Sequence, residues 1–210
     1  MRTRIKICGL TREQDVDAAI AAGVDAVGFV FYPPSPRFLA LDQALALVSH
    51  VPPFVSKVAL FVNEGKSAVE AILSKIPVDM LQFHGEEDDQ YCASFDKPFL
   101  KVARVKSGID LLEFARSYPS AAGLLLDSHV EGYGGEGKMF DWSVIPSKLP
   151  LPMILSGGLH SGNVSVAIGK TKPWAVDVSS GVESSKGIKD AAKIADFIAA
   201  VKHADSLSIP

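Results

Sequence analysis

The stretch Lys6-Ile7-Cys8-Gly9-Leu10-Thr11 joins a short apolar run to the first amphipathic pattern of the chain. The run Arg4–Cys8 predicts a β-strand, and the apolar spacing over Thr11–Ala22 predicts a helix. Cys8 therefore stands at the end of a strand, beside a glycine and the start of a helix. The positive end of a helix dipole favours a thiolate that acts as a base or nucleophile, whereas the alternative is a buried structural thiol.

The same alternation of strand and helix continues along the chain. Several strands are almost continuously apolar, as expected for parallel strands buried on both faces. Strands are predicted at Arg4–Cys8, Asp25–Phe31, Ser56–Val62, Met80–Phe83, Phe99–Ala103, Gly123–Asp127, Met153–Ser156 and Ala175–Val178. Helices are predicted at Thr11–Ala22, Leu41–Val48, Lys66–Ser74, Ile109–Ser117, Ser161–Ile168 and Lys189–Val201, and less clearly at Glu86–Ser94 and Trp142–Ile145.

Eight such units without a break in composition favour one α/β domain, a closed (β/α)8 TIM barrel of near-minimal length. An open, doubly wound sheet is the structural alternative. We expect the barrel domain to span residues 1–202. Residues 203–210 lose apolar periodicity and are expected to form a loose C-terminal tail.

Composition limits the classes of protein to which the chain can belong. Of its 210 residues 48% are hydrophobic, and the net charge is −3 without a basic stripe, which argues against nucleic acid as a partner. No apolar run approaches the about 20 residues that cross a bilayer, and no signal peptide is evident. Two cysteines cannot form a disulfide framework, so we expect a reducing, cytoplasmic location.

Local signals mark several helix ends. Thr11, with Gln14 three residues later, predicts a capping box, and Asp110 and Asp190 are expected near the first turns of their helices. Gly23 is expected to end the first helix.

In (β/α)8 barrels the active site lies in the loops that follow the strands. The unusual residues of this chain follow strand ends, as that rule requires. They are Cys8, Arg37, His84, Asp127, Gly157-Gly158 and Ser179-Ser180-Gly181.

Three of these side chains are candidates for acid–base chemistry or substrate contact. Asp127 ends an apolar strand, where partial desolvation raises a carboxyl pKa and suits a general acid, although a turn aspartate is the alternative. Arg37 lies in a proline-stiffened loop and suits a carboxylate or phosphate, unless it is a solvent-facing ion-pair partner. His84 is either a substrate contact or a histidine at the edge of the core.

Glycines after the seventh and eighth strands suggest a phosphate site. Gly157, Gly158, Ser180 and Gly181 would offer backbone N–H groups to an anion, and barrels frequently bind phosphate at this place. A helix beginning near Gly187–Asp190 would add its dipole. Tight turns are the alternative.

Two apparent motifs are rejected. Gly132–Gly137 matches a dinucleotide fingerprint, but no helix follows it directly and no acidic residue stands at the required distance, so a mobile loop that folds over a ligand is the better interpretation. The acidic residues after His84 are interpreted as the start of a helix, because the histidines have no metal-ligand spacing. Cys92 is interpreted as structural.

Several segments, in order, resemble phosphoribosylanthranilate isomerases over Lys6 to about Asp190. They are Lys6–Thr11, Phe61–Asn63, Gln82–Gly85, Leu126-Asp127, Phe140–Trp142, Ser156–Leu159 and Asp177–Glu183. The resemblance implies a (β/α)8 barrel of the tryptophan pathway that uses neither cofactor nor metal and acts on a small phosphosugar–anthranilate. The sequence leaves a monomer and a homodimer open.

Carried over by motif position, the resemblance implies roles for the candidate residues. Cys8 would be the general base, Asp127 the general acid and Arg37 the anchor of the anthranilate carboxylate. The phosphate would bind Gly157, Gly158, Ser180 and Gly181. Two residues depart from the family's usual pattern: Glu136, where threonine is common, and Lys186, where proline is usual.

Two other functions remain as alternatives. One is another phosphate-binding barrel, such as the histidine-pathway aminoaldose isomerase, which has an aspartate in place of Cys8 and two similar half-barrels. The other is a non-catalytic barrel that binds a sugar phosphate, against which the presence of both Cys8 and Asp127 argues.

Overall fold

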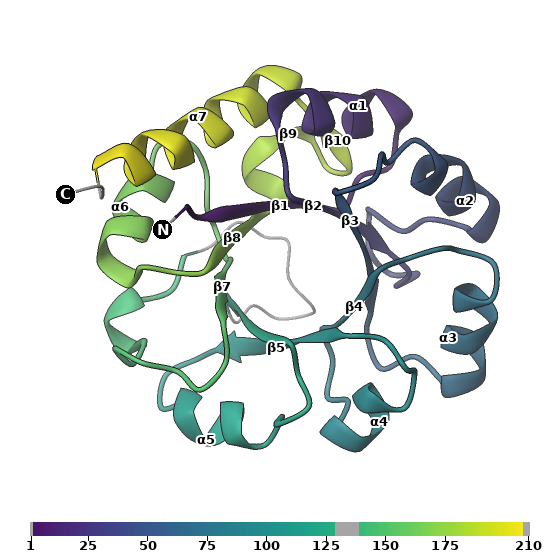
Figure 1. Ribbon diagram of the computed structural model, residues 1–210, viewed down its shortest axis with the longest axis horizontal. Helices are drawn as coiled ribbons and strands as arrows, with labels where there is room; N and C mark the ends of the chain where they lie inside the picture. The colour runs from purple at the N-terminus through teal and green to yellow at the C-terminus, as the bar shows by residue number, and fades with distance from the viewer. Residues whose placement is uncertain (1, 129–138, 208–210) are drawn as a thin grey trace.

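Eight parallel strands form a closed barrel in the order β1 to β8, surrounded by helices (Figure 1). The structure is a computed structural model that describes residues 2–128 and 139–207. The barrel strands are β1 Arg4–Cys8, β2 Ala26–Val30, β3 Ser56–Phe61, β4 Met80–Phe83, β5 Phe99–Val105, β6 Gly123–Ser128, β7 Met153–Leu155 and β8 Ala175–Val178. The helices are α1 Glu13–Ala22, α2 Leu41–Ser49, α3 Lys66–Leu73, α4 Asp89–Ala93, α5 Leu111–Arg116, α6 Val164–Thr171 and α7 Ala191–Leu207, with short 3-10 turns η1 Trp142–Val144 and η2 Ser180–Val182.

Pairing of β1 with β8 closes the barrel. Arg4 pairs with Ala175 and Lys6 with Asp177, both strands running in parallel. The closed barrel predicted from the sequence is thus confirmed, and the open, doubly wound sheet is wrong.

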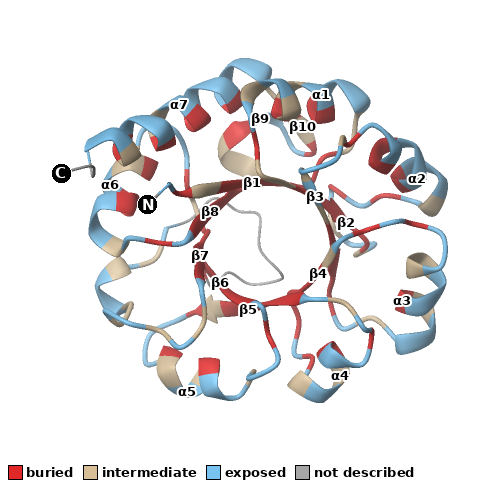
Figure 2. Ribbon diagram, in the orientation of Figure 1, coloured by how far each residue is buried: buried red, intermediate tan, exposed pale blue. Residues whose placement is uncertain are grey.

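Successive side chains along each strand point alternately out of and into the barrel, so the protein has one apolar core beneath the helices and another inside the barrel. Side chains that point outward from the barrel, such as Phe29, Phe61 and Phe83, pack beneath the helices in the largest apolar cluster. A smaller cluster around Leu100 and Leu125 comes from residues that point inward. Figure 2 shows the result: the strand ring is buried and the outer faces of the helices are exposed.

The start of α1 differs from its prediction. The N-cap residue is Arg12 and makes no side-chain capping bond, so the capping box of Thr11 and Gln14 is wrong. The Thr11 hydroxyl instead donates to the carbonyl of Gly187 in the turn between β9 and β10, a contact that the local sequence does not reveal. Gly23 ends α1 in the left-handed conformation and Asp110 caps α5, as predicted.

The chain after β8 also differs from its prediction. The strands β9 Glu183–Ser185 and β10 Ile188–Lys189 form a hairpin, and α7 begins only after it. Asp190 accepts from the amides of Ala192 and Lys193, so the first amides of α7 are capped by this side chain. That α7 lends its dipole to a phosphate stays a prediction; the hairpin separates the start of this helix from the end of β8.

Helix α7 includes residues 203–207, which were assigned to a loose tail. Ala204 is buried, and the carboxylate of Asp205 accepts from the backbone N–H and the hydroxyl of Thr3 at 2.8 and 2.7 Å. These contacts hold the helix onto the first strand. The tail assignment is wrong for these five residues.

A buried ion pair between Lys101 of β5 and Glu87 holds the loops that follow β3 and β4. The ammonium of Lys101 lies 2.9 Å from Glu87, whose carboxylate also accepts from the backbone amides of Asn63 and Gly85. The acidic residues after His84 were interpreted as the start of a helix, which is confirmed for Asp88 and Asp89, since Asp88 caps α4. Glu87 lies before that helix and anchors both loops.

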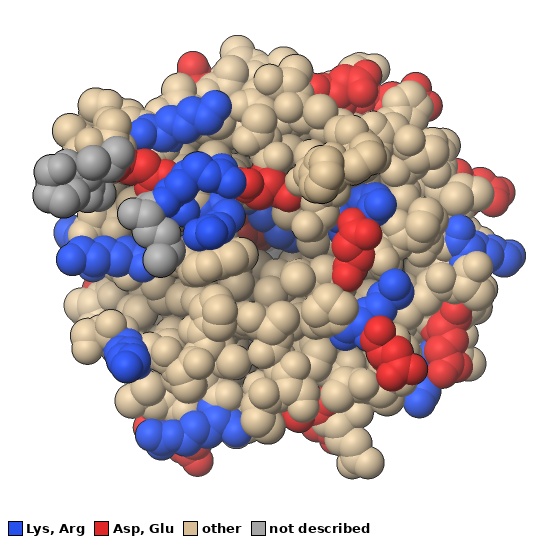
Figure 3. Space-filling model, in the orientation of Figure 1, with Lys and Arg blue, Asp and Glu red and all other residues tan. Residues whose placement is uncertain are grey.

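No helix within residues 2–128 and 139–207 is long and apolar enough to cross a membrane. On the face shown in Figure 3, basic and acidic side chains are interspersed around a mostly uncharged centre.

Candidate active site

A cavity of about 290 Å³ opens at the carboxyl ends of the barrel strands. It collects residues that are far apart in the sequence, and all of the predicted site residues except Gly181 line it. Those residues are Cys8, Arg37, His84, Asp127, Gly157, Gly158 and Ser180.

Cys8 ends β1 and is 5% exposed. One wall of the cavity beside it is apolar, formed with Val30, Leu60 and Val62. Burial raises the pKa of the thiol above its ordinary value, and the charge of Asp177 adds to this, while the positive charges of Lys6 and Lys189 oppose it. The two cations near Cys8 therefore favour its thiolate, whereas its desolvation favours the neutral thiol.

Asp127 ends β6 and lies beside His84, which follows β4. The His84 Nε2 atom is 3.3 Å from Asp127 Oδ2, while Asp127 Oδ1 accepts from the amide of Ser128. Both side chains are buried and line the cavity. Around the barrel, β7 and β8 separate Asp127 from Cys8, so the thiol and the carboxyl approach a ligand from different sides.

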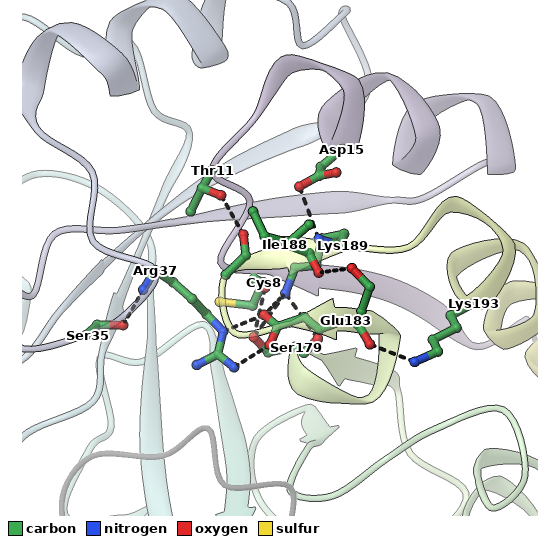
Figure 4. A network of polar contacts seen from close by, with 12 residues as sticks. Cys8, Thr11, Asp15, Ser35, Arg37, Ser179, Glu183, Ile188, Lys189 and Lys193 are labelled. Carbon is green, nitrogen blue, oxygen red and sulfur yellow. Dashed lines mark hydrogen bonds and ion pairs between the residues drawn. The ribbon is translucent and has the colours of Figure 1, made fainter.

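Arg37 is buried and held by an acidic partner from the other end of the chain. Its Nε and Nη2 atoms donate to the two carboxylate oxygens of Glu183 at 2.7 and 2.8 Å. Lys189 lies 2.9 Å from the same carboxylate and also donates to the carbonyl of Ser179. Figure 4 shows this network beside Cys8. Arg37 is thus not the solvent-facing ion-pair partner that was its alternative.

Burial and the neighbouring charges have opposing effects on the pKa values of Glu183 and Lys189, and the outcome differs between the two groups. Burial alone would raise the pKa of Glu183, but the hydrogen bond from Arg37 and the charge of Lys189 outweigh it, so that pKa lies below its usual range. Burial lowers the pKa of Lys189 despite the attraction of Glu183. Glu183 therefore remains a carboxylate at neutral pH and orients Arg37 toward the cavity.

We expect Glu183→Gln to lower the free energy of unfolding by about 3–5 kcal/mol, since it leaves Arg37 and Lys189 buried without their anion. Arg37→Met is the matched comparison and costs less, because Glu183 keeps Lys189. The low pKa of Glu183 makes this contribution complete at neutral pH and reduces it as the pH falls below about 4. Urea unfolding at neutral and acidic pH measures the difference; equal stability of Glu183→Gln and the unsubstituted protein at neutral pH would contradict the expectation.

The glycine loops lie where they were predicted, with one exception. Gly157 and Gly158 have positive φ values of 81° and 65° and line the cavity after β7, and Ser180 lines it after β8. Gly181 does not line the cavity. A Cβ atom there would lie 1.9 Å from the carbonyl oxygen of Leu159, so this glycine allows the two loops to approach each other.

Sequence reasoning missed several polar residues around the cavity. Asp177 lines it and forms a buried ion pair with Lys6, which lies beneath it. Gln82 also lines it, and its Oε1 atom has no hydrogen-bond partner among the described residues. Period-two alternation could have found Lys6, because it lies two residues before Cys8 on the same face of the strand. The segment Gly132–Gly137, including Glu136, lies outside the described residues.

A thiol, a carboxyl, a histidine and an oriented arginine meet at the mouth of an eight-stranded barrel, where enzymes of the (β/α)8 class carry their active sites, and these groups are capable of acid–base chemistry on a small molecule. The family model for N-(5'-phosphoribosyl)anthranilate (PRA) isomerase matches residues 5–200. The chain belongs to this family.

Individual relatives agree along almost the whole chain. The N-(5'-phosphoribosyl)anthranilate isomerase of Dechloromonas aromatica is 60% identical over 98% of this chain and 99% of its own, and that of Leptothrix cholodnii is 57% identical over 99% and 94%. The crystal structure of phosphoribosyl anthranilate isomerase from Thermotoga maritima has 39% identity and a TM-score of 0.87 over 96% of this chain and 99% of its own. A further structure, at 36% identity and a TM-score of 0.84 over the same shares, is in complex with reduced 1-(o-carboxyphenylamino)-1-deoxyribulose 5-phosphate.

Proposed function

We propose that this chain isomerises N-(5'-phosphoribosyl)anthranilate to 1-(o-carboxyphenylamino)-1-deoxyribulose 5-phosphate in L-tryptophan biosynthesis, with Cys8 as general base and Asp127 as general acid. Family membership supports the reaction. The observation that carries the roles is the presence of both side chains, from β1 and β6, in one cavity.

The reaction is an Amadori rearrangement and needs two proton transfers. A protonated Asp127 gives its proton to the ribose ring oxygen, which opens the aminoaldose to a Schiff base. A Cys8 thiolate then removes the proton from C2′, and the resulting enolamine tautomerises to the aminoketose. One acid and one base are sufficient for this sequence, since no atom is gained or lost and the redox change is internal to the substrate.

The remaining cavity residues serve as anchors. Arg37, oriented by Glu183, binds the anthranilate carboxylate through the guanidinium nitrogen that Glu183 does not use. Gly157, Gly158 and Ser180 bind the phosphate, with Gly181 allowing their loops to approach. Holding both ends of the substrate places C2′ between the base and the acid. His84 contacts the substrate beside Asp127.

The finer properties of the protein remain predictions. Among the relatives, the phosphoribosylanthranilate isomerase of Thermotoga maritima is dimeric, and monomers have been generated from it. For this chain both a monomer and a homodimer are compatible with the sequence. A cytoplasmic location is proposed from the biosynthetic role.

The purified protein is expected to consume N-(5'-phosphoribosyl)anthranilate without added metal, followed as loss of substrate fluorescence. Heat-denatured protein is the control for spontaneous decay of the substrate. Turnover of the histidine-pathway aminoaldose alone would favour the alternative isomerase, and binding of the product without turnover would favour the non-catalytic barrel. Either result would contradict the proposal.

A further inference from the structure

Lys6 lies in β1 two residues before Cys8, and both side chains point into the barrel. Lys6 is 4% exposed and is not among the residues that line the cavity. Its ammonium therefore lies beneath the site, where it does not contact the substrate directly. A charged group in this place needs a reason, because burial of an ammonium is costly unless it is paired.

An ion pair between Lys6 and Asp177 of β8 compensates part of the cost of burying the ammonium. The Lys6 Nζ atom is 3.0 Å from Asp177 Oδ1, and the hydroxyl of Ser156 donates to Asp177 Oδ2 at 3.2 Å. Burial favours the neutral amine, but the charges of Asp177 and of an ionised Cys8 outweigh it and hold the pKa of Lys6 above its ordinary value. Lys6 is thus a permanent cation under the floor of the cavity.

The Lys6 ammonium also lies close to the Cys8 thiol, which is a second interaction that accounts for its burial. Gly28 of β2 pairs with Cys8, and a Cβ atom there would lie 2.8 Å from Cys8 Sγ and 3.1 Å from Lys6 Nζ. Because Cys8 Sγ and Lys6 Nζ both lie this close to one point beside Gly28, the two atoms are within the range of about 4–6 Å over which an opposite charge stabilises an ionised group. Any larger residue at this position would push the two side chains away.

We propose that Lys6 is a positioning residue for the isomerisation, which stabilises the thiolate of Cys8 from beneath so that the base is a Cys8–Lys6 pair. This inference rests on the proposed function, in which Cys8 is the base. Asp177 and Ser156 fix the ammonium, and Gly28 provides the space. When Cys8 takes the C2′ proton the pair loses its charge attraction, and when the thiol releases that proton to water after the product leaves, the pair is restored.

Other charged groups also act on Cys8. Asp177 faces it from β8 and disfavours the thiolate, Lys189 of β10 favours it, and Asp127 and His84 line the same cavity. Since the first two have opposite effects, removal of Lys6 is expected to leave the thiol with a net loss of positive charge.

The test is the pH dependence of alkylation of Cys8 by iodoacetamide, which reacts with the thiolate. In Lys6→Met we expect the midpoint of thiolate formation to rise by about 1–3 pH units relative to the unsubstituted protein, the usual effect of removing a close opposite charge. Peptide mass spectrometry separates Cys8 from Cys92, which is fully buried and whose pKa burial raises to about 12.

Lys101→Met is the matched control, because Lys101 is also buried and lies 2.9 Å from its own carboxylate, Glu87, away from the cavity. It is expected to lose stability and to keep the Cys8 midpoint. Should Lys6→Met fail to fold, Lys6→Met/Asp177→Asn removes both charges and is compared with Asp177→Asn alone. A midpoint that is unchanged in these comparisons would overturn the proposal and leave Lys6 as a purely structural partner of Asp177.

Activity measurements add a second readout. The rising limb of kcat/KM against pH is expected to move upward in Lys6→Met by the same shift as the alkylation midpoint, with little change in KM. Because alkylation needs no substrate, it tests the pair even if the protein does not turn over N-(5'-phosphoribosyl)anthranilate. Failure of the proposed function is thereby separated from failure of this inference.

Discussion

Cys8→Ala is expected to lower the turnover of N-(5'-phosphoribosyl)anthranilate by at least ~100-fold, the lower end of the effect of losing a general base. Alanine removes the proposed base, which is the β1 residue that lines the cavity, and creates little strain, because the thiol lies against an apolar wall. Substrate affinity changes less, since Arg37 and the glycine loops are untouched. Steady-state kinetics by fluorescence measure both quantities.

The pH dependence sharpens this expectation. The pKa of Cys8 lies above its ordinary value, so the thiolate is a minor form at neutral pH and increases about tenfold per pH unit below that pKa. The kcat/KM of the unsubstituted protein therefore rises with pH through the neutral range, and the residual activity of Cys8→Ala lacks this rise. Cys92→Ala, which alters a buried thiol of α4, is the matched control and is expected to keep near-normal turnover. A near-normal rate in Cys8→Ala would remove Cys8 from the role of base.

Asp127→Asn is expected to have an effect of similar size, about 100-fold or more on kcat, because an amide cannot give a proton to the ring oxygen. Asparagine preserves the shape of the side chain and can still accept the hydrogen bond from the amide of Ser128. The fold should therefore remain intact, which unfolding in urea verifies.

Asp110→Asn serves as the control for this substitution. Asp110 caps α5 by accepting from the amides of Leu112 and Glu113, and asparagine is an equally good N-cap. Its turnover is expected to match that of the unsubstituted protein. If Asp127→Asn also retained full turnover, the general acid would have to be another group.

The barrel could be predicted from the sequence because its signal is local. Buried parallel strands are short apolar runs, and residues such as Leu124 and Val176 identify them without knowledge of the rest of the chain. The same rule locates the cavity, since strand ends in a barrel converge. Cys8, Asp127 and the glycines after β7 could therefore be found in advance.

The polar partners could not be found in the same way. Glu183 orients Arg37 across 146 residues, and Asp177 holds Lys6 across 171 residues, so both pairs depend on closure of the barrel. Lys189 was assigned to a helix because the hairpin β9–β10 is too short to produce a strand pattern. Thr11 was misassigned because its real partner, Gly187, lies at the far end of the sequence.

The pairing of β1 with β8 has a consequence for how the protein is made. While the ribosome is still synthesising the chain, Lys6 and Arg37 have emerged early, but the carboxylates of Asp177 and Glu183 that hold them come from its last fifth. A nascent chain therefore leaves the edge of β1 unpaired until β8 has been released, and Arg37 has no anion until β9 follows. A chain that stops before β8 lacks both anions and the strand that closes the barrel, so we expect it to have no partial activity.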